Sequence, residues 1–256
     1  MKECCKMKNM QTPVSYLREI RTKEMPRDID EYPFNIPSLR EGNFHLSFES
    51  PVTFFVGENG SGKSTVLEAI AIGSGFNPGG GSRNTLNNQR RSESILHEHL
   101  IFTWKKKVFD GFFLRAESFF NFASFLEEWE QETGEDFHGP YGGKSLHEQS
   151  HGESFITLAK NRFKKGLYLL DEPEAALSPL RQLTLLSLMN EYVIQGDSQY
   201  IIATHSPIIL SYPGATILEF SSNGLKKVAY KDTEHFTVTK DFLNAPEAFL
   251  KHLFEK

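Results

Sequence analysis

Cysteine is almost absent from this chain, since the only two among its 256 residues are the neighbours Cys4 and Cys5. Adjacent cysteines rarely pair with each other, and a disulfide framework needs more of them. No apolar run approaches the roughly 20 residues that a membrane-spanning helix requires. The charged N-terminal segment also lacks the apolar stretch of a signal peptide. These absences predict a reduced, cytoplasmic protein with no direct membrane insertion.

Excess positive charge is missing as well, because 28 Lys and Arg face 33 Asp and Glu and give a net charge of -5. This balance gives no bulk attraction to nucleic acid or to anionic lipid. The basic groups 105–107 and 90–91 leave a nucleic-acid partner open, although a solvated turn is the more common role of such groups. Hydrophobic residues, by contrast, make up 39% of the chain and include 22 Phe. That share predicts a globular protein with an aromatic-rich core.

The order of the expected elements predicts an α/β fold with a mixed, mainly parallel sheet flanked by helices. We expect a flexible N-terminal lead-in over residues 1–30 and a single domain over 31–256, with an inserted helical subdomain at about 75–165. Periodicity predicts strands at 43–48, 52–56, 99–104, 111–116, 167–170, 199–203 and 215–220, and helices at 64–72, 117–131, 154–163 and 179–194. The last helix is expected to bury Leu180, Leu183, Leu186, Met189 and Val193.

The strongest motif fits the phosphate-loop pattern G-x-x-x-x-G-K-[ST]. Its glycines let the backbone wrap phosphate oxygens, and its amides and the following helix N-terminus supply positive potential. The apolar run 52–56 precedes it and an amphipathic helix follows, as such a loop requires. The residues predicted to bind ATP are Gly57, Glu58, Asn59, Gly60, Ser61, Gly62, Lys63, Ser64 and Thr65.

A second motif delivers two carboxylates, Asp171 and Glu172, at the end of a buried strand. Asp171 and the Ser64 hydroxyl are expected to hold Mg²⁺, as the matching groups do in P-loop NTPases. Glu172 is then placed to orient the attacking water. His205 follows another buried strand and so faces the same crevice, where it is expected to contact the γ-phosphate. The alternatives are a solvated acidic turn and a structural histidine.

These residues resemble the ABC-ATPase superfamily in their identity and in their order along the chain. Residues 175–178 are similar to its D-loop, and His205 matches its switch histidine. The family's signature motif corresponds here to Ser150, His151, Gly152 and Glu153. The resemblance implies that this segment grips ATP held by a second copy, giving a head-to-tail homodimer. An ordinary serine helix cap is the alternative interpretation of Ser150.

Residues 111–120 and 150–154 resemble small stand-alone bacterial AAA/ABC-like ATPases, related to the SMC-like and overcoming-lysogenization-defect-like branch. Glu117 lies where the family has its metal-sensing glutamine, and Gln89 is a weaker candidate. The resemblance implies Mg-dependent ATP hydrolysis that drives dimerisation, in DNA metabolism, repair or defence, with a nucleic acid or an unidentified protein as a further partner. A transporter subunit and a non-hydrolysing, ATP-gated interaction module remain alternatives.

Overall fold

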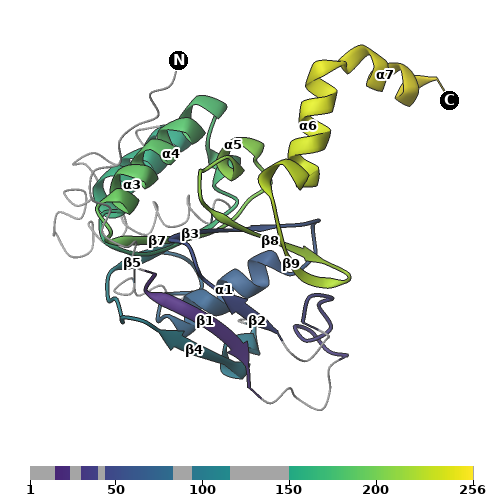
Figure 1. The fold of residues 1–256 in the computed structure, drawn as a ribbon. Coiled ribbons are helices and arrows are strands. Elements are labelled where there is room, and N and C mark those ends of the chain that lie inside the picture. The colour runs from purple at the N-terminus through teal and green to yellow at the C-terminus, as the bar shows by residue number, and fades with distance from the viewer. Residues whose placement is uncertain (1–14, 24–29, 40–43, 83–93, 116–149, 256) are drawn as a thin grey trace.

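The computed structural model describes residues 15–23, 30–39, 44–82, 94–115 and 150–255. Within them the chain forms two β-sheets that enclose one helix, and further helices cover the outer face of the larger sheet (Figure 1). The strands are β1 (Leu17–Thr22), β2 (His45–Ser47), β3 (Val52–Val56), β4 (Leu100–Trp104), β5 (Gly111–Arg115), β6 (Gly166–Asp171), β7 (Ser198–Ala203), β8 (Thr216–Ser221) and β9 (Gly224–Val228). The α-helices are α1 (Lys63–Gly73), α3 (His151–Arg162), α4 (Pro179–Ile194), α5 (Pro207–Leu210), α6 (Glu234–Asn244) and α7 (Pro246–Phe254), with 3-10 helices η1 (Ile95–His99), η5 (Pro173–Ala176) and η6 (Tyr230–Asp232).

The larger sheet has the strand order β5-β6-β7-β3-β8-β9. Neighbours from β5 to β8 run parallel, and β9 returns antiparallel at the edge. Every residue of β3, β6 and β7 is buried, which suits apolar strands covered on both faces. The prediction of a mixed, mainly parallel sheet is confirmed. Parallel pairing also brings the segments that follow β3, β6 and β7 to one edge.

The smaller sheet is antiparallel, with the order β2-β1-β4. The prediction of a flexible lead-in is therefore wrong for Leu17–Thr22, which is the central strand of this sheet. Leu17 and Ile20 are buried, and the Gln199 side-chain amide bonds both the N–H and the C=O of Leu17, at 2.8 and 3.0 Å. The sequence did not predict this strand because charged residues surround it. Its strand partners β2 and β4 also lie later in the chain, so no local pattern marks the pairing.

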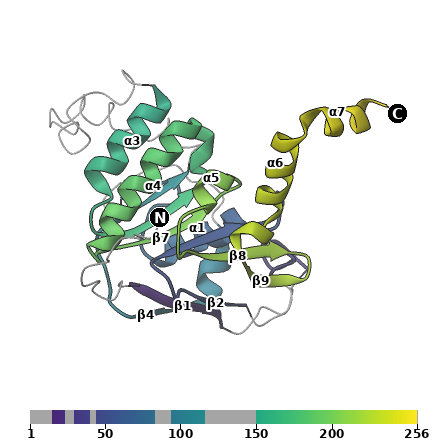
Figure 2. The same ribbon diagram turned by 45° about the horizontal axis from the view of Figure 1, so that its top comes forward.

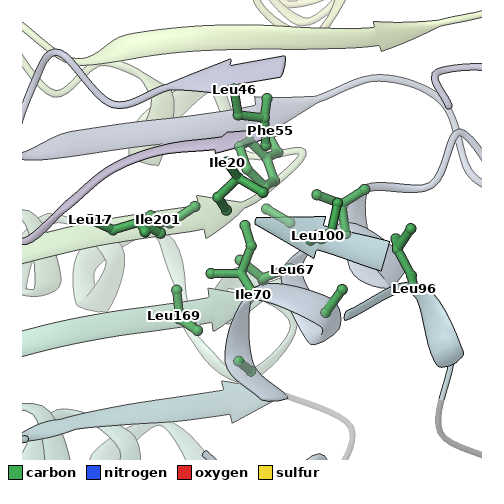
Figure 3. Close-up of a cluster of buried hydrophobic side chains, with 14 of the residues drawn as sticks. Leu17, Ile20, Leu46, Phe55, Leu67, Ile70, Leu96, Leu100, Leu169 and Ile201 are labelled. Carbon is green, nitrogen blue, oxygen red and sulfur yellow. The ribbon is translucent and has the colours of Figure 1, made fainter. Parts of the chain in front are cut away.

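Two apolar cores hold the layers together. In the first, α1 lies between the sheets, and its Leu67 and Ile70 meet Leu17 and Ile20 of β1 and Ile201 of β7 (Figure 3). The second core lies on the opposite face of the larger sheet, under α3, α4 and α5 (Figure 2). No helix in the described ranges combines the length and the apolar character needed to cross a bilayer.

The buried face of α4 differs from the predicted one near the start of the helix. Leu180 and Leu183 are 74% and 53% exposed, whereas Gln182 and Leu185 are buried. Met189 is buried as predicted, and Leu186 and Val193 pack partly buried against the core. Gln182 turns inward because its amide N–H donates to the Leu177 carbonyl and its oxygen accepts from Ser206, so a polar residue with satisfied hydrogen bonds occupies a core position.

The remaining boundaries agree with the expected elements, apart from α3. That helix begins at His151, three residues before the expected start at 154. The predicted helix 117–131 lies outside the described residues, as does much of the predicted subdomain at 75–165. Within that range, β4 belongs to the smaller sheet and β5 to the larger one.

Gly111 opens β5 in a backbone conformation that only glycine adopts easily, with φ of 153°. A Cβ here would overlap the Leu167 carbonyl oxygen and lie 2.7 Å from the ring of Phe76. We expect Gly111→Ala to lower the free energy of unfolding by about 3 kcal/mol, measured by urea titration. Gly214→Ala is the control, because Gly214 has φ of 76° but open space around it. It should cost about 1 kcal/mol, and equal losses at both positions would contradict the steric explanation.

Candidate functional site

The phosphate-loop residues join the end of β3 to the start of α1. Gly62 has φ of 100°, and a Cβ there would overlap Ile36 Cγ2, so glycine is required at this turn. The buried Lys63 ammonium donates to the carbonyls of Gly57 and Glu58, both at 2.8 Å. Burial lowers the pKa of Lys63 below its ordinary value, although nearby carboxylates oppose this. The loop thus surrounds a desolvated cation with backbone that can approach an anion closely.

A cavity of about 370 Å³ opens beside this loop. Its lining includes six residues of the predicted phosphate loop, namely Asn59, Gly60, Gly62, Lys63, Ser64 and Thr65. Glu172 and the segment 32–37 complete the wall. The loop was predicted from its motif, whereas the contribution of residues 32–37 was not. A chamber of this size, with a cationic floor and a carboxylate at one side, suits a nucleotide.

Ser64 and Asp171 meet at the predicted metal position. The Ser64 hydroxyl donates to Asp171 Oδ1 at 2.9 Å, which joins the start of α1 to the end of β6. Burial raises the pKa of Asp171, while the Arg115 guanidinium and the Ser64 hydroxyl oppose that rise. One hydroxyl and one carboxylate are hard oxygen donors of the kind that Mg²⁺ takes beside phosphate oxygens and water. This donor pair therefore fits Mg²⁺.

Arg115 is a member of the site that the sequence did not reveal. Its guanidinium lies 2.8 Å from Glu68 Oε2 and 3.3 Å from Asp171 Oδ2, and all three side chains are at most 13% exposed. The register of β5 on β6 places Arg115 directly opposite Asp171. The only available signal was a basic residue at the end of an apolar strand, where the other strands end in polar site residues.

We expect Arg115→Gln to destabilise the fold by about 3 kcal/mol at pH 7.5, because it leaves two buried carboxylates without their cation. Without Arg115, the folded-state pKa of Asp171 rises further above its unfolded value. A raised pKa stabilises the folded state at low pH, and that stability is lost as the pH rises through the folded pKa. The deficit relative to wild type should therefore shrink when urea unfolding is measured at pH 5.

The control for Arg115→Gln is Lys227→Gln, which breaks the exposed ion pair with Glu49 at 2.9 Å. An exposed pair contributes less than about 1 kcal/mol, and its loss should change little with pH. A deficit in Arg115→Gln that stays constant from pH 5 to pH 7.5 would contradict the assignment of Arg115 as the partner of Asp171.

Glu172 and His205 follow the paired ends of β6 and β7. Glu172 is the one non-glycine residue in the described ranges with positive φ, at 49°, and its N–H donates to the Ala203 carbonyl at 2.9 Å. Such a conformation is uncommon outside functional turns. Glu172 Oε1 lies 3.7 Å from His205 Nε2. The predicted catalytic residues Lys63, Glu172 and His205 thus converge at one edge of the sheet.

The His205 ring offers an unused polar atom. Burial lowers the pKa of His205 and the Lys63 charge lowers it further, while the Glu172 carboxylate opposes this. Its Nε2 is buried and has no hydrogen-bond partner among the described residues. A buried polar atom without a partner is costly and indicates a place where a ligand binds.

Two family models match separate parts of the chain. One, described as "AAA domain", matches residues 34–132. The other, described as "AAA domain, putative AbiEii toxin, Type IV TA system", matches residues 154–211. The first range contains the phosphate loop, and the second contains Asp171, Glu172 and His205. Comparison with curated proteins gives no match.

Solved structures of low sequence identity share the fold. A structure titled as an inward-facing "putative metal-chelate type ABC transporter" is 16% identical, with a TM-score of 0.50 over 88% of each chain. cbiO1 from Clostridium perfringens, part of the ABC transporter complex cbiONQ, is 17% identical, with a TM-score of 0.49 over 93% of this chain and 98% of that one. The SMC head domain from Thermotoga maritima is 14% identical, with a TM-score of 0.45 over 84% and 98%.

The chain has the fold of an ABC-type P-loop ATPase, and both of its motif-bearing segments match AAA-domain models.

The signature segment lies at the start of α3, and none of its residues is in the lining of the cavity. Ser150 is at the N-cap position but makes no side-chain cap bond, and its hydroxyl accepts from Arg181 at 2.8 Å. Gly152 packs so closely that a Cβ would lie 2.8 Å from the Ala176 carbonyl, and Glu153 lies 4.0 Å from Arg181. Ser150 therefore lacks the side-chain hydrogen bond to the helix backbone that an ordinary serine cap makes. The side chain of His151 and all of Glu117 and Gln89 lie outside the described residues.

Glu174 holds the backbone at His205, and the sequence did not single it out. Its partly buried carboxylate accepts from the Thr204 hydroxyl at 2.7 Å and from the His205 backbone N–H at 2.5 Å. Burial raises the pKa of Glu174, while these two hydrogen bonds oppose that rise. The contact ties the turn after β6 to the turn after β7. The only sequence feature that marks Glu174 is its position as a charged residue between Pro173 and two alanines, directly after the Asp171–Glu172 pair.

Two further side chains lie beside the phosphate loop. The Tyr32 ring, 61% exposed, lines the cavity, and its hydroxyl lies 3.2 Å from Thr65 Oγ1. On the other side of the loop, the His235 ring meets the His205 ring edge-on at 4.8 Å. Both residues come from segments far from the motifs, so no local pattern marked them.

Proposed function

We propose that the chain binds ATP with Mg²⁺, hydrolyses it to ADP and phosphate, and pairs head to tail with a second copy. The observation that carries this proposal is a cavity lined by Lys63, Ser64 and Glu172. Asp171 bonds the Ser64 hydroxyl, and His205 lies 3.7 Å from Glu172, so both adjoin this lining. The signature residues Ser150, Gly152 and Glu153 do not line that cavity. A partner's α3 start would supply them, since a helix N-terminus favours an anion.

Each side chain at the site has its own role in binding or hydrolysis. The Lys63 ammonium and the loop amides bind the β- and γ-phosphates, which places the triphosphate against the end of β6. Mg²⁺, when held by Ser64 and Asp171, neutralises charge on the phosphate oxygens. Glu172 orients a water molecule toward the γ-phosphorus and accepts its proton. The neutral His205 donates from Nε2 to a γ-phosphate oxygen, and Glu174 fixes its position.

The test is phosphate release by the purified chain at increasing protein concentration. Because each proposed site needs two copies, the rate per mole of chain should rise with concentration and level off once the dimer dominates. The rate should also fall to background when EDTA removes Mg²⁺. A rate per mole that is the same at all concentrations would contradict the shared site.

We propose that this protein acts in DNA metabolism, repair or defence rather than as a subunit of a transporter. The family's signature is usually written L-S-G-G-Q or L-S-G-G-E, and here Gln149 replaces its leucine and His151 its first glycine. These departures support that choice, as does the resemblance to stand-alone ATPases. DNA or RNA should then stimulate phosphate release several-fold at low salt, with the effect fading as salt screens the phosphate contacts. Stable co-purification with a membrane protein would favour the transporter alternative.

A further inference from the structure

The helices α6 and α7 form an arm that rises from the body beside the larger sheet (Figures 1 and 2). Neither helix contains a single buried residue. The arm nevertheless carries large apolar side chains, which are Val238, Phe242, Leu243, Phe249, Leu250, Leu253 and Phe254, each between 37% and 77% exposed. Helices of this composition normally bury their apolar side, so the arm lacks a packing partner among the described residues.

The apolar side chains of the arm form a continuous surface. Phe249, Leu250 and Leu253 recur at helical spacing along α7. The rings of Phe242 and Phe249 meet edge-on at 5.9 Å and join α6 to α7 at the corner. A surface of this extent, shared by two helices, is larger than the scattered apolar residues that need no explanation.

The root of the arm lies at the nucleotide site. His235, in the first turn of α6, contacts the His205 ring. A groove of about 510 Å³ is lined by Glu58, Asn59 and His205 on the body and by His235 and Val238 on α6. The arm therefore leaves the body directly beside the phosphate loop and His205.

A second unpartnered apolar patch lies at the start of α4, where Leu180 and Leu183 are 74% and 53% exposed. They are three residues apart and share one face of the helix. Arg181 between them bonds the Ser150 hydroxyl at 2.8 Å. This patch therefore adjoins the signature half-site, just as the arm adjoins the phosphate-loop half-site.

We infer that the arm of one copy packs on the Leu180–Leu183 patch of a second copy and clamps the nucleotide-bound pair. This inference rests on the proposed head-to-tail pairing, which brings each phosphate-loop half-site against the partner's signature half-site. The two-fold symmetry makes the contact twice, so both apolar surfaces of each copy are covered. The His235–His205 contact connects the clamp to the γ-phosphate end of the site.

The charges of the arm favour a protein partner over other occupants. Residues 234–254 contain three acids, Glu234, Asp241 and Glu247, and two bases, Lys240 and Lys251. The sum is a net charge of -1, with no basic stripe. An interfacial membrane helix or a nucleic-acid contact would instead need a strongly basic polar face.

The test compares variants in a Glu172→Gln background, in which the MgATP-bound dimer accumulates, by sedimentation velocity. The arm variant is Leu250→Glu with Leu253→Glu, and the patch variant is Leu183→Glu. Each should weaken the MgATP-dependent dimer about a hundredfold, because each places charge in two symmetric apolar contacts. Fluorescent ATP binding to the monomer and the unfolding midpoint should not change. Ile95→Glu is the control, since Ile95 is 48% exposed on η1 and should leave the dimer intact.

A charge exchange tests the contact itself. Leu253→Lys combined with Leu183→Glu should restore dimerisation to within about tenfold of the control, because opposite charges then face each other across the interface. The inference is overturned if the arm variant dimerises like Ile95→Glu, or if the arm forms a dimer that needs no nucleotide. If the Glu172→Gln parent binds ATP but stays monomeric, the proposed pairing fails, and the clamp fails with it.

Discussion

The Glu172→Gln variant is expected to bind MgATP as tightly as the wild type and to release phosphate about a thousandfold more slowly. The amide keeps the size of the carboxylate but cannot take the proton of the attacking water. The side chain is about half exposed and makes no buried hydrogen bond among the described contacts, so the fold should be unaffected. Phosphate release under single-turnover conditions gives the rate, and equilibrium binding of fluorescent ATP gives the affinity.

Glu49→Gln is the matched control for this result. Glu49 pairs with Lys227 on the surface at 2.9 Å, so the same chemical change occurs away from the cavity. Its turnover should equal that of the wild type. Undiminished turnover in Glu172→Gln would show that another group activates the water, and equal losses in both variants would point to a nonspecific cause.

The Lys63→Met variant is expected to lose MgATP affinity by about a hundredfold or more, because it removes the buried cation that faces the phosphates. The lysine is held by two carbonyl oxygens at 2.8 Å and is therefore preorganised for an anion. Isothermal titration with MgATP measures the loss. Lys227→Met removes an exposed lysine instead and should bind as the wild type does.

The lowered pKa of Lys63 adds a dependence on pH. A lysine with a lowered pKa loses its charge at a lower pH than an ordinary lysine does. Nucleotide affinity in the wild type should therefore begin to fall at a lower alkaline pH than expected for a free side chain. In Lys63→Met this alkaline decline should be absent, and an identical decline in both proteins would assign it to another group.

The site could be predicted from the sequence wherever its residues follow an apolar strand. The run Val52–Val56 is a strand as predicted, and the phosphate loop, Asp171 and His205 each follow such a run. Short buried strands are legible because apolar side chains must occupy every position. Parallel pairing then determines that the three segments meet at one edge.

The residues that the sequence did not reveal are defined by contacts between distant segments. Arg115 reaches Asp171 because β5 pairs with β6 in this register. Glu174 contacts the turn after β7 through the backbone N–H of His205. His235 reaches His205 only because α6 returns to the sheet edge. Nothing in the immediate neighbourhood of these residues marks them, since each is charged or polar in an ordinary local pattern.

The outward face of α4 shows how tertiary contacts override a periodic pattern. The spacing of Leu180, Leu183 and Leu186 predicts burial of all three, but only Leu186 packs against the core. The hydrogen bonds of Gln182 to Leu177 and Ser206 hold the neighbouring side of the first turns inward instead. Leu180 and Leu183 therefore stay exposed and form the patch of the proposed clamp.

Sedimentation velocity of the purified chain, with and without MgATP, is the most direct test of the shared nucleotide site. We predict a monomer without nucleotide, a species of twice the mass in Glu172→Gln with MgATP, and no such species when Lys63→Met is added to that variant. An unchanged mass in Glu172→Gln, under conditions where titration shows the site saturated with MgATP, would contradict the account.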